Sequence, residues 1–229
     1  MDTQQNPLQG VKSRIAKAAT QAGRDPRDIL LLAVSKTFPP ERIRKTCADG
    51  QTHFGENYLQ EALEKMDALA DLPITWHFIG PIQSNKTRLI AERFAWVHSI
   101  ERSKIAERLA AQRPTHLPAL QVCIQVNTSG ERSKSGCTPD EVIALARDIV
   151  KLPNLQLRGL MTVPEPTDDL ILQRSRFESL AAMLEEGVAA GIPMDTLSMG
   201  MSMDLEQAIA AGATIVRVST AIFGARTTR

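Results

Sequence analysis

Residues 29–34 read ILLLAV, six consecutive apolar residues between two segments with helical periodicity. A short run of this kind is typical of a strand buried on both faces of a parallel sheet. Seven more short apolar or alternating runs follow, so that the full set is ILLLAV (29–34), THFGEN (52–57), ITWHFIG (74–80), WVHSI (96–100), LQVCIQV (120–126), LQLRGLM (155–161), DTLSMG (195–200) and ATIVRVS (213–219). The sequence therefore predicts eight strands.

Segments with helical spacing of apolar residues separate these runs. In 59–70, for example, Leu59, Ala62, Leu63 and Met66 fall on one face of a helix. A leading helix is expected over 11–22 and ends at Gly23. The other expected helices cover 40–48, 59–70, 83–93, 103–112, 138–151, 168–190 and 203–211. Strands and helices thus alternate along the whole chain.

Repeated strand–helix units imply parallel strands joined by right-handed crossovers. Eight of them in 229 residues fit a closed (β/α)8 TIM barrel with little inserted material. We therefore expect an α/β protein with a single domain, residues 1–229, that begins with an N-terminal helix. An open doubly wound sheet is the alternative, and it is disfavoured because no GxGxxG motif follows the first strand.

The composition excludes several functional classes. Lys and Arg number 27 against 26 Asp and Glu, a net charge of +1, so no basic excess is available for nucleic acid. The apolar runs are far shorter than the roughly 20 residues that span a bilayer, which predicts no membrane segment. Three cysteines without a CxxC pair suit reduced thiols, with no disulfide and no metal site. We expect a cytoplasmic protein.

In a barrel of this type, functional groups lie at the carboxyl ends of the strands. The two-residue period of the first strand places Leu30, Leu32, Val34 and then Lys36 on one face. Lys36 is therefore either a strand-end lysine whose amine reaches solvent, or a desolvated amine able to form a Schiff base with an aldehyde.

The last strand carries a second polar signal at the same end of the barrel. Arg217 shares a face with Ile215 and Ser219, so it points into the barrel and needs a carboxylate or a polar ligand. Beyond it, Ser219 and Thr220 begin a short helical segment, and Ser202 precedes the helix expected over 203–211. These two neighbouring loops form the usual phosphate site of such barrels.

A reactive lysine and a phosphate site in one barrel suggest a phosphorylated aldehyde. Pyridoxal 5'-phosphate (PLP) is one candidate cofactor, and a sugar phosphate in a lysine-dependent aldolase is equally compatible with the chemistry. The residues taken by themselves leave these two possibilities open.

Several blocks of sequence resemble the pyridoxal phosphate homeostasis protein family, which is related to the N-terminal domain of alanine racemase. The blocks, in order, are AVSKT (33–37), HFGENYLQEALEK (53–65), WHFIGPIQSNKTR (76–88), SKSG (133–136), LRGLM (157–161), LSMGMSMDLEQAIAAG (197–212) and RVSTAIFGAR (217–226). Together they cover nearly the whole chain in one order, which is far more specific than any single block.

The resemblance implies that Lys36 forms a Schiff base with PLP and that Arg217 faces the pyridine nitrogen. It also implies that the phosphate is held by Ser202, Ser219 and Thr220. Two more implied cofactor-binding residues complete the set: Asn57 near the ring substituents, and His77, for which a core histidine with satisfied hydrogen bonds is the alternative. No catalytic residue and no metal ligand are expected.

Two positions differ from the common family pattern. Ser219 replaces a usual glycine, so that a hydroxyl contact to the phosphate takes the place of close backbone approach. Phe38 stands where bacterial members often have a second basic residue, two positions after Lys36. Lys134, in SKSG, is a candidate for a second basic contact, with a solvated loop charge as the alternative.

The resemblance implies a non-catalytic carrier or regulator in intracellular PLP homeostasis, with PLP-dependent apoenzymes as possible partners. A low-activity PLP-dependent amino-acid racemase, or a related decarboxylase-like enzyme of the same fold type (fold type III), is the rival. Racemisation needs an acid/base on each face of the cofactor, and one barrel of 229 residues leaves no room for the second domain that racemases use. We therefore expect a monomer that does not turn over substrate.

Overall fold

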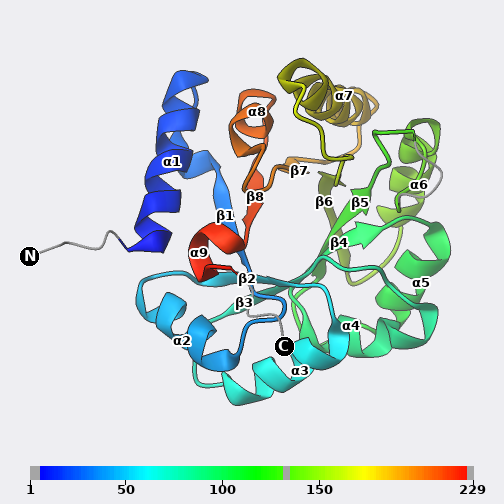
Figure 1. Cartoon of the computed structure of the whole chain (residues 1–229). Helices are drawn as coiled ribbons and strands as arrows, with labels where there is room; N and C mark the ends of the chain where they lie inside the picture. Colours follow the sequence, from blue (N-terminus) through cyan, green and yellow to red (C-terminus); the bar gives the residue numbers. More distant parts are fainter. Residues whose placement is uncertain (1–5, 131–134, 226–229) are drawn as a thin grey trace, which may run out of the picture.

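The computed structural model describes residues 6–130 and 135–225. Eight parallel strands in these residues form a closed barrel in chain order, with β8 paired to β1 (Figure 1). The strands are β1 (Leu30–Val34), β2 (His53–Glu56), β3 (Thr75–Phe78), β4 (Trp96–Ile100), β5 (Leu120–Gln125), β6 (Leu155–Met161), β7 (Thr196–Ser198) and β8 (Ile215–Val218). The predicted (β/α)8 barrel is confirmed.

Helices surround the barrel and connect its strands (Figure 1). The α-helices are α1 (Pro7–Gln21), α2 (Pro40–Ala48), α3 (Leu59–Ala68), α4 (Thr87–Arg93), α5 (Ser103–Gln112), α6 (Val142–Ile149), α7 (Leu170–Ala189), α8 (Leu205–Ala210) and α9 (Thr220–Phe223). Short 3-10 turns precede β1, α4 and α6, at η1 (Pro26–Asp28), η2 (Ser84–Lys86) and η3 (Pro139–Glu141). The leading helix α1 packs against α8 and α9.

Alternate residues of each strand face two different environments. Leu31 and Ala33 of β1, like Val216 and Val218 of β8, belong to the apolar core between strands and helices. Leu32 and Arg217, which are register partners on these two strands, lie outside that core and face the barrel interior. The two-residue period thus directs one set of apolar residues toward the helices, and it directs Leu32 and Arg217 into the barrel interior.

Most of the differences from the expected elements lie at their ends. The leading helix starts earlier than expected, at Pro7, because the side chain of Asn6 accepts a hydrogen bond from the Leu8 backbone N–H and caps it. The helix α8 begins at Leu205 and not at Met203, with Asp204 as its N-cap residue. Ser202 therefore lies in the loop before α8 and does not cap it.

Candidate functional site

Lys36 lies directly after β1, at the carboxyl end of the barrel, and is half-buried. The next residue, Thr37, has a φ of 69°, a left-handed conformation that non-glycine residues rarely adopt. Its backbone N–H donates to a carboxylate oxygen of Glu61, in the first turn of α3. The chain around Lys36 is therefore held in an unusual conformation by a contact from the neighbouring strand–helix unit.

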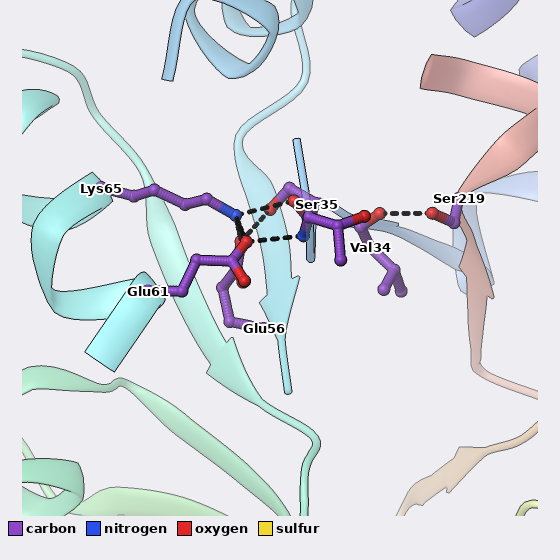
Figure 2. Close-up of polar contacts among 7 residues, drawn as sticks. Val34, Ser35, Glu56, Glu61, Lys65 and Ser219 are labelled. Atoms are coloured by element: carbon purple, nitrogen blue, oxygen red, sulfur yellow. Dashed lines mark hydrogen bonds and ion pairs between the residues drawn. The ribbon is translucent and has the colours of Figure 1, made fainter. Parts of the chain in front are cut away.

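A buried cluster of charges supports the residue on the other side of Lys36 (Figure 2). Lys65 of α3 donates from Nζ to the Ser35 carbonyl oxygen and to Glu56 Oε1, both at 2.8 Å, and it also contacts Glu61. The Ser35 hydroxyl donates to the same Glu56 oxygen at 2.6 Å. Together these contacts fix the backbone on both sides of Lys36, at Ser35 and at Thr37.

The central pair of this cluster, Lys65 and Glu56, is almost fully removed from water. The side chains of Lys65 and Glu56 are 4% and 0% exposed. Burial raises the pKa of Glu56, while the Lys65 ammonium and the Ser35 hydroxyl act in the opposite direction. Among the residues that the structure describes, Glu56 Oε2 has no hydrogen-bond partner. The pair is therefore a buried ion pair whose charges depend on each other.

Arg217 points into the barrel from β8 and is 4% exposed. Its Nη1 donates to the carbonyl and the hydroxyl of Ser198, at 2.7 and 2.8 Å, and its Nη2 donates to the Thr162 carbonyl at 2.7 Å. Burial lowers its pKa to about 10, partly opposed by Asp204, so the guanidinium is charged at neutral pH. These bonds use three of its five N–H donors, and the other two have no hydrogen-bond partner among the described residues.

His77 is fully buried, with both ring nitrogens in contact with other histidines. Its Nε2 lies 2.9 Å from His53 Nδ1, and its Nδ1 lies 2.9 Å from His98 Nε2. Burial and the two neighbouring rings lower its pKa well below the usual value. The structure thus gives His77 the hydrogen bonds of a satisfied core histidine, with neither ring nitrogen left for a ligand.

Asn57 follows β2 directly, at the same end of the barrel as Lys36. Its Oδ1 is buried and has no hydrogen-bond partner within residues 6–130 and 135–225. The backbone packs closely behind it, since a Cβ added at Gly80 would lie 2.1 Å from the Asn57 carbonyl oxygen. Asn57 therefore offers a fixed and unsatisfied polar group at this end of the barrel.

Ser202, Ser219 and Thr220 follow β7 and β8, as expected from the sequence. The Ser219 hydroxyl donates to the Val34 carbonyl oxygen at 2.8 Å, which links the end of β8 to the end of β1 (Figure 2). Thr220 is exposed at the first position of α9. The Ser219 hydroxyl is therefore anchored to the strand that carries Lys36 and retains its capacity to accept.

The loop that contains Ser202 is fixed by the leading helix. Arg14 of α1 donates from Nη1 to the Ser202 carbonyl oxygen at 2.7 Å and forms an ion pair with Glu206 of α8. Met201 donates its backbone N–H to Asp204 Oδ1 at 2.6 Å, and burial raises the pKa of Asp204. The expected phosphate loop is thus held by contacts from α1 and from Asp204, although Asp204 adds a half-buried carboxyl group to it.

A cavity of about 380 Å³ lies at the opposite end of the barrel, away from the candidate residues. It is lined by α1 and the beginnings of β1 and β2, including Lys12, Gln51 and His53. This cavity is not part of the candidate site, because no candidate residue lines it.

Lys134 lies outside the described residues. Within the described part of the chain, no helix has the length and apolar character that crossing a membrane requires, and no cluster could hold a metal ion.

Sequence reasoning missed the groups that support the expected residues. Lys65 lies on the apolar face of α3 with Ala62 and Met66, and Glu56 shares the outward face of β2 with Phe54. A lysine and a glutamate on facing apolar surfaces are a signal for a buried pair, because neither is buried alone. Sequence reasoning also overlooked Ser198, His53 and His98, which occupy interior-facing positions on their strands.

Comparison with known proteins first gives the class. Residues 8–227 match the family model "Alanine racemase, N-terminal domain". A crystal structure of alanine racemase from Corynebacterium glutamicum superposes with a TM-score of 0.69 at 17% identity, over 95% of this chain and 62% of the racemase. The molecule is thus a single barrel of the alanine racemase N-terminal class with a lysine after its first strand.

The particular family follows from closer relatives. The chain is 58% identical to the pyridoxal phosphate homeostasis protein of Pseudomonas aeruginosa, over 99% of this chain and 97% of that one. It is 50% identical to that of Escherichia coli, over 96% and 95%. The protein belongs to the pyridoxal phosphate homeostasis protein family, as the sequence blocks predicted.

A solved relative has the same family fold. PipY from Synechococcus elongatus, in a structure with PLP bound, is 36% identical with a TM-score of 0.80, and the match covers 92% of this chain and 100% of PipY. Its structure without PLP superposes equally well, with a TM-score of 0.82.

Proposed function

We propose that this protein binds PLP at the carboxyl end of the barrel, through the amine of Lys36, and holds the cofactor for intracellular PLP homeostasis. The carrying observation is the fixed position of Lys36 between Ser35 and Thr37, both held by the buried Lys65 cluster. A half-buried lysine whose backbone is held in a defined conformation is suited to bond covalently with an aldehyde carbon. The PLP-bound structure of PipY supports the same cofactor here.

The other groups at this end fit PLP by their chemistry. Arg217 has two N–H donors beyond those used within the protein, and a guanidinium can donate to a pyridine nitrogen. Asn57 provides an unsatisfied buried oxygen for the ring substituents. Ser202, Ser219 and Thr220 provide hydroxyls for the phosphate. A sugar phosphate has no aromatic nitrogen for Arg217, so this arrangement favours PLP over the aldolase alternative.

We further propose that the protein stores or delivers PLP and does not turn over amino acids efficiently. PLP supports racemisation by withdrawing electrons when bound. Arg217 is charged at neutral pH and cannot accept the ring proton, so the ring nitrogen stays unprotonated and electron withdrawal is weak. A low-activity racemase is the competing function, and chiral analysis of common amino acids incubated with the PLP-loaded protein would detect it.

The decisive test locates the covalent bond. The PLP-loaded protein is reduced with borohydride, digested and analysed by mass spectrometry. We expect the pyridoxyl mass on the peptide that contains Lys36 and loss of the visible absorbance in Lys36→Ala. The matched control is Lys45→Ala, an exposed lysine of α2, which retains the absorbance. A pyridoxyl group on another lysine, or unchanged colour in Lys36→Ala, would refute the proposal.

The wider setting of the protein is also proposed. We place it in the cytoplasm, where its three free cysteines remain reduced. We propose that residues 1–229 act as one domain, because α1 packs on α8 and α9, and that the protein is a monomer. Apo forms of PLP-dependent enzymes are the proposed recipients. Light scattering coupled to gel filtration tests the monomer, and a dimer mass would refute it.

A further inference from the structure

A continuous row of hydrogen bonds runs through the barrel interior from β2 to Arg217. His53 Nδ1 lies 2.9 Å from His77 Nε2, and His77 Nδ1 lies 2.9 Å from His98 Nε2. His98 Nδ1 lies 2.8 Å from Ser198 Oγ, which accepts a hydrogen bond from Arg217 Nη1 at 2.8 Å. We call these five residues the histidine chain.

The arginine sets the direction of every bond in the histidine chain. A guanidinium only donates, so Ser198 Oγ is an acceptor toward Arg217. The Ser198 hydroxyl proton then has one acceptor among the described residues, His98 Nδ1. His98 must therefore carry its proton on Nε2 and donate to His77 Nδ1. By the same logic His77 donates from Nε2 to His53 Nδ1.

Burial keeps the central rings neutral. His77 and His98 are fully buried, and Arg217 disfavours a positive charge on His98. His77 is stacked on Trp96, with ring centroids 5.3 Å apart, and the titratable groups that influence it within the described part of the chain are His53 and His98. The Arg158 guanidinium lies over the Trp96 ring, 5.0 Å from its centroid. The rings of His77 and His98 are therefore neutral, and the position of the proton on one ring determines which nitrogen of the next ring accepts.

The two ends of the histidine chain face different surroundings. At the carboxyl end, Asp204 is the carboxyl group that interacts electrostatically with Arg217. At the amino end, His53 is half-buried and lines the cavity of about 380 Å³ together with Lys12 and Arg27. Burial lowers the pKa of His53. The histidine chain thus connects the cavity at the amino end of the barrel to the arginine of the proposed cofactor site.

We propose that the histidine chain acts as one unit that positions Arg217. The arginine imposes one proton order, in which each histidine carries its proton on Nε2 and accepts a hydrogen bond on Nδ1. His53 then gains a second proton only when that order is broken or reversed. The added proton on His53 Nδ1 would face His77 Nε2, which already carries one. Reversal through both rings would place a proton on His98 Nδ1, opposite the Ser198 hydroxyl. Ser198 would then lose its acceptor beside the guanidinium.

His98 and His77 are therefore positioning residues that act on Arg217 through Ser198. The importance of Arg217 for the cofactor rests on the proposed function, but the proton order does not. The proton order depends only on the residues of the histidine chain and can be measured in the protein without PLP. Failure of the tautomer test would leave PLP binding untouched, and failure of PLP binding would leave the proton order untouched.

The test is nuclear magnetic resonance of the full chain labelled with ¹⁵N-histidine. Long-range ¹H–¹⁵N correlations at pH 7.5 distinguish protonation at Nδ1 from protonation at Nε2. We expect a single Nε2–H tautomer at His53, His77 and His98. The exposed His116, which lies outside the histidine chain, gives an internal reference signal. An Nδ1–H tautomer, or an average of both tautomers, at His98 or His77 would overturn the proposal.

Substitution separates this ordering from packing. Ser198→Ala removes the hydroxyl and keeps Arg217, and we expect His98 to become a tautomer mixture and the titration of His53 to move to higher pH. The matched control is Ser99→Ala, a neighbouring buried serine that donates to the Gly80 carbonyl outside the histidine chain. Ser198→Thr, which keeps a hydroxyl, should retain the order. Unchanged tautomers in Ser198→Ala, or equal changes in Ser99→Ala, would contradict the inference.

Discussion

At the scale of single residues, Lys65 determines how the segment around Lys36 is held. Its side chain is 4% exposed and its ammonium meets Glu56, Glu61 and the Ser35 carbonyl. A buried ion pair adds little net stability over an apolar pair, but removing one partner leaves the other charge buried and uncompensated. Loss of Lys65 would therefore destabilise the fold mainly because it leaves the buried Glu56 carboxylate without a countercharge.

We predict that Lys65→Met lowers the free energy of unfolding by about 3–5 kcal/mol, because Glu56 is left without its countercharge. Urea denaturation followed by circular dichroism measures the change. The matched control is Arg44→Met, which breaks an exposed ion pair with Asp71 and should change the stability little, because solvent screens the two charges. Adding Glu56→Gln to Lys65→Met should recover part of the loss. Equal costs for Lys65→Met and Arg44→Met would contradict this account.

At the scale of elements, the closeness of neighbouring strands depends on particular glycines. Gly159 of β6 pairs with Thr196 of β7, and a Cβ at Gly159 would lie 1.9 Å from the Thr196 carbonyl oxygen. By contrast, a Cβ at Gly10 of α1 would have no atom within 4 Å. The same residue type is therefore required in one element and replaceable in the other.

We predict opposite effects of alanine at these two glycines. Gly159→Ala forces β6 away from β7 and should lower the free energy of unfolding by at least about 1–3 kcal/mol, the usual cost of overpacking. Gly10→Ala should raise it by about 0.5–1 kcal/mol, because alanine has the higher helix propensity and meets no clash. Chemical denaturation of both variants decides the matter, and a neutral Gly159→Ala would refute the close strand contact.

At the scale of the whole molecule, the closed barrel encloses titratable rings that must stay neutral. His77 and His98 are fully buried, and burial lowers the pKa of His98 to about 3. In the unfolded chain, a histidine binds a proton at about pH 6.5. The unfolded state therefore binds more protons than the folded state below that pH. Stability from these residues is complete above about pH 6.5 and falls as the pH drops toward 3.

We predict that His98 alone lowers the free energy of unfolding by about 1.4 kcal/mol per pH unit between roughly pH 6 and 4, and that His77 acts in the same direction. Urea denaturation at half-unit pH intervals measures the slope. In His98→Gln the slope should be lower by about 1.4 kcal/mol per pH unit. The difference between the two slopes cancels the contribution of carboxyl groups, and identical slopes would refute the neutral, buried state of His98.

The elements that the sequence predicted best are those whose signals are local. The strands over 96–100 and 155–161 and the helix over 103–112 have the expected bounds, because alternation, periodicity and flanking polar residues all lie within each segment. The start of α8 was misplaced by two residues, since Asp204 rather than Ser202 occupies the N-cap position. End positions depend on contacts from elsewhere, such as that of Arg14 with the Ser202 carbonyl oxygen.

The sequence by itself determined the alternation of strands and helices, the barrel, the family and the place of Lys36 and Arg217 at strand ends. These follow from short-range patterns and from blocks of residues in a fixed order. Only the tertiary structure decided that Lys65 and Glu56 meet beside Lys36, and that His53, His77 and His98 join in one row. Barrel closure and strand register bring these side chains together from distant positions, and no local periodicity encodes which interior groups become hydrogen-bond partners.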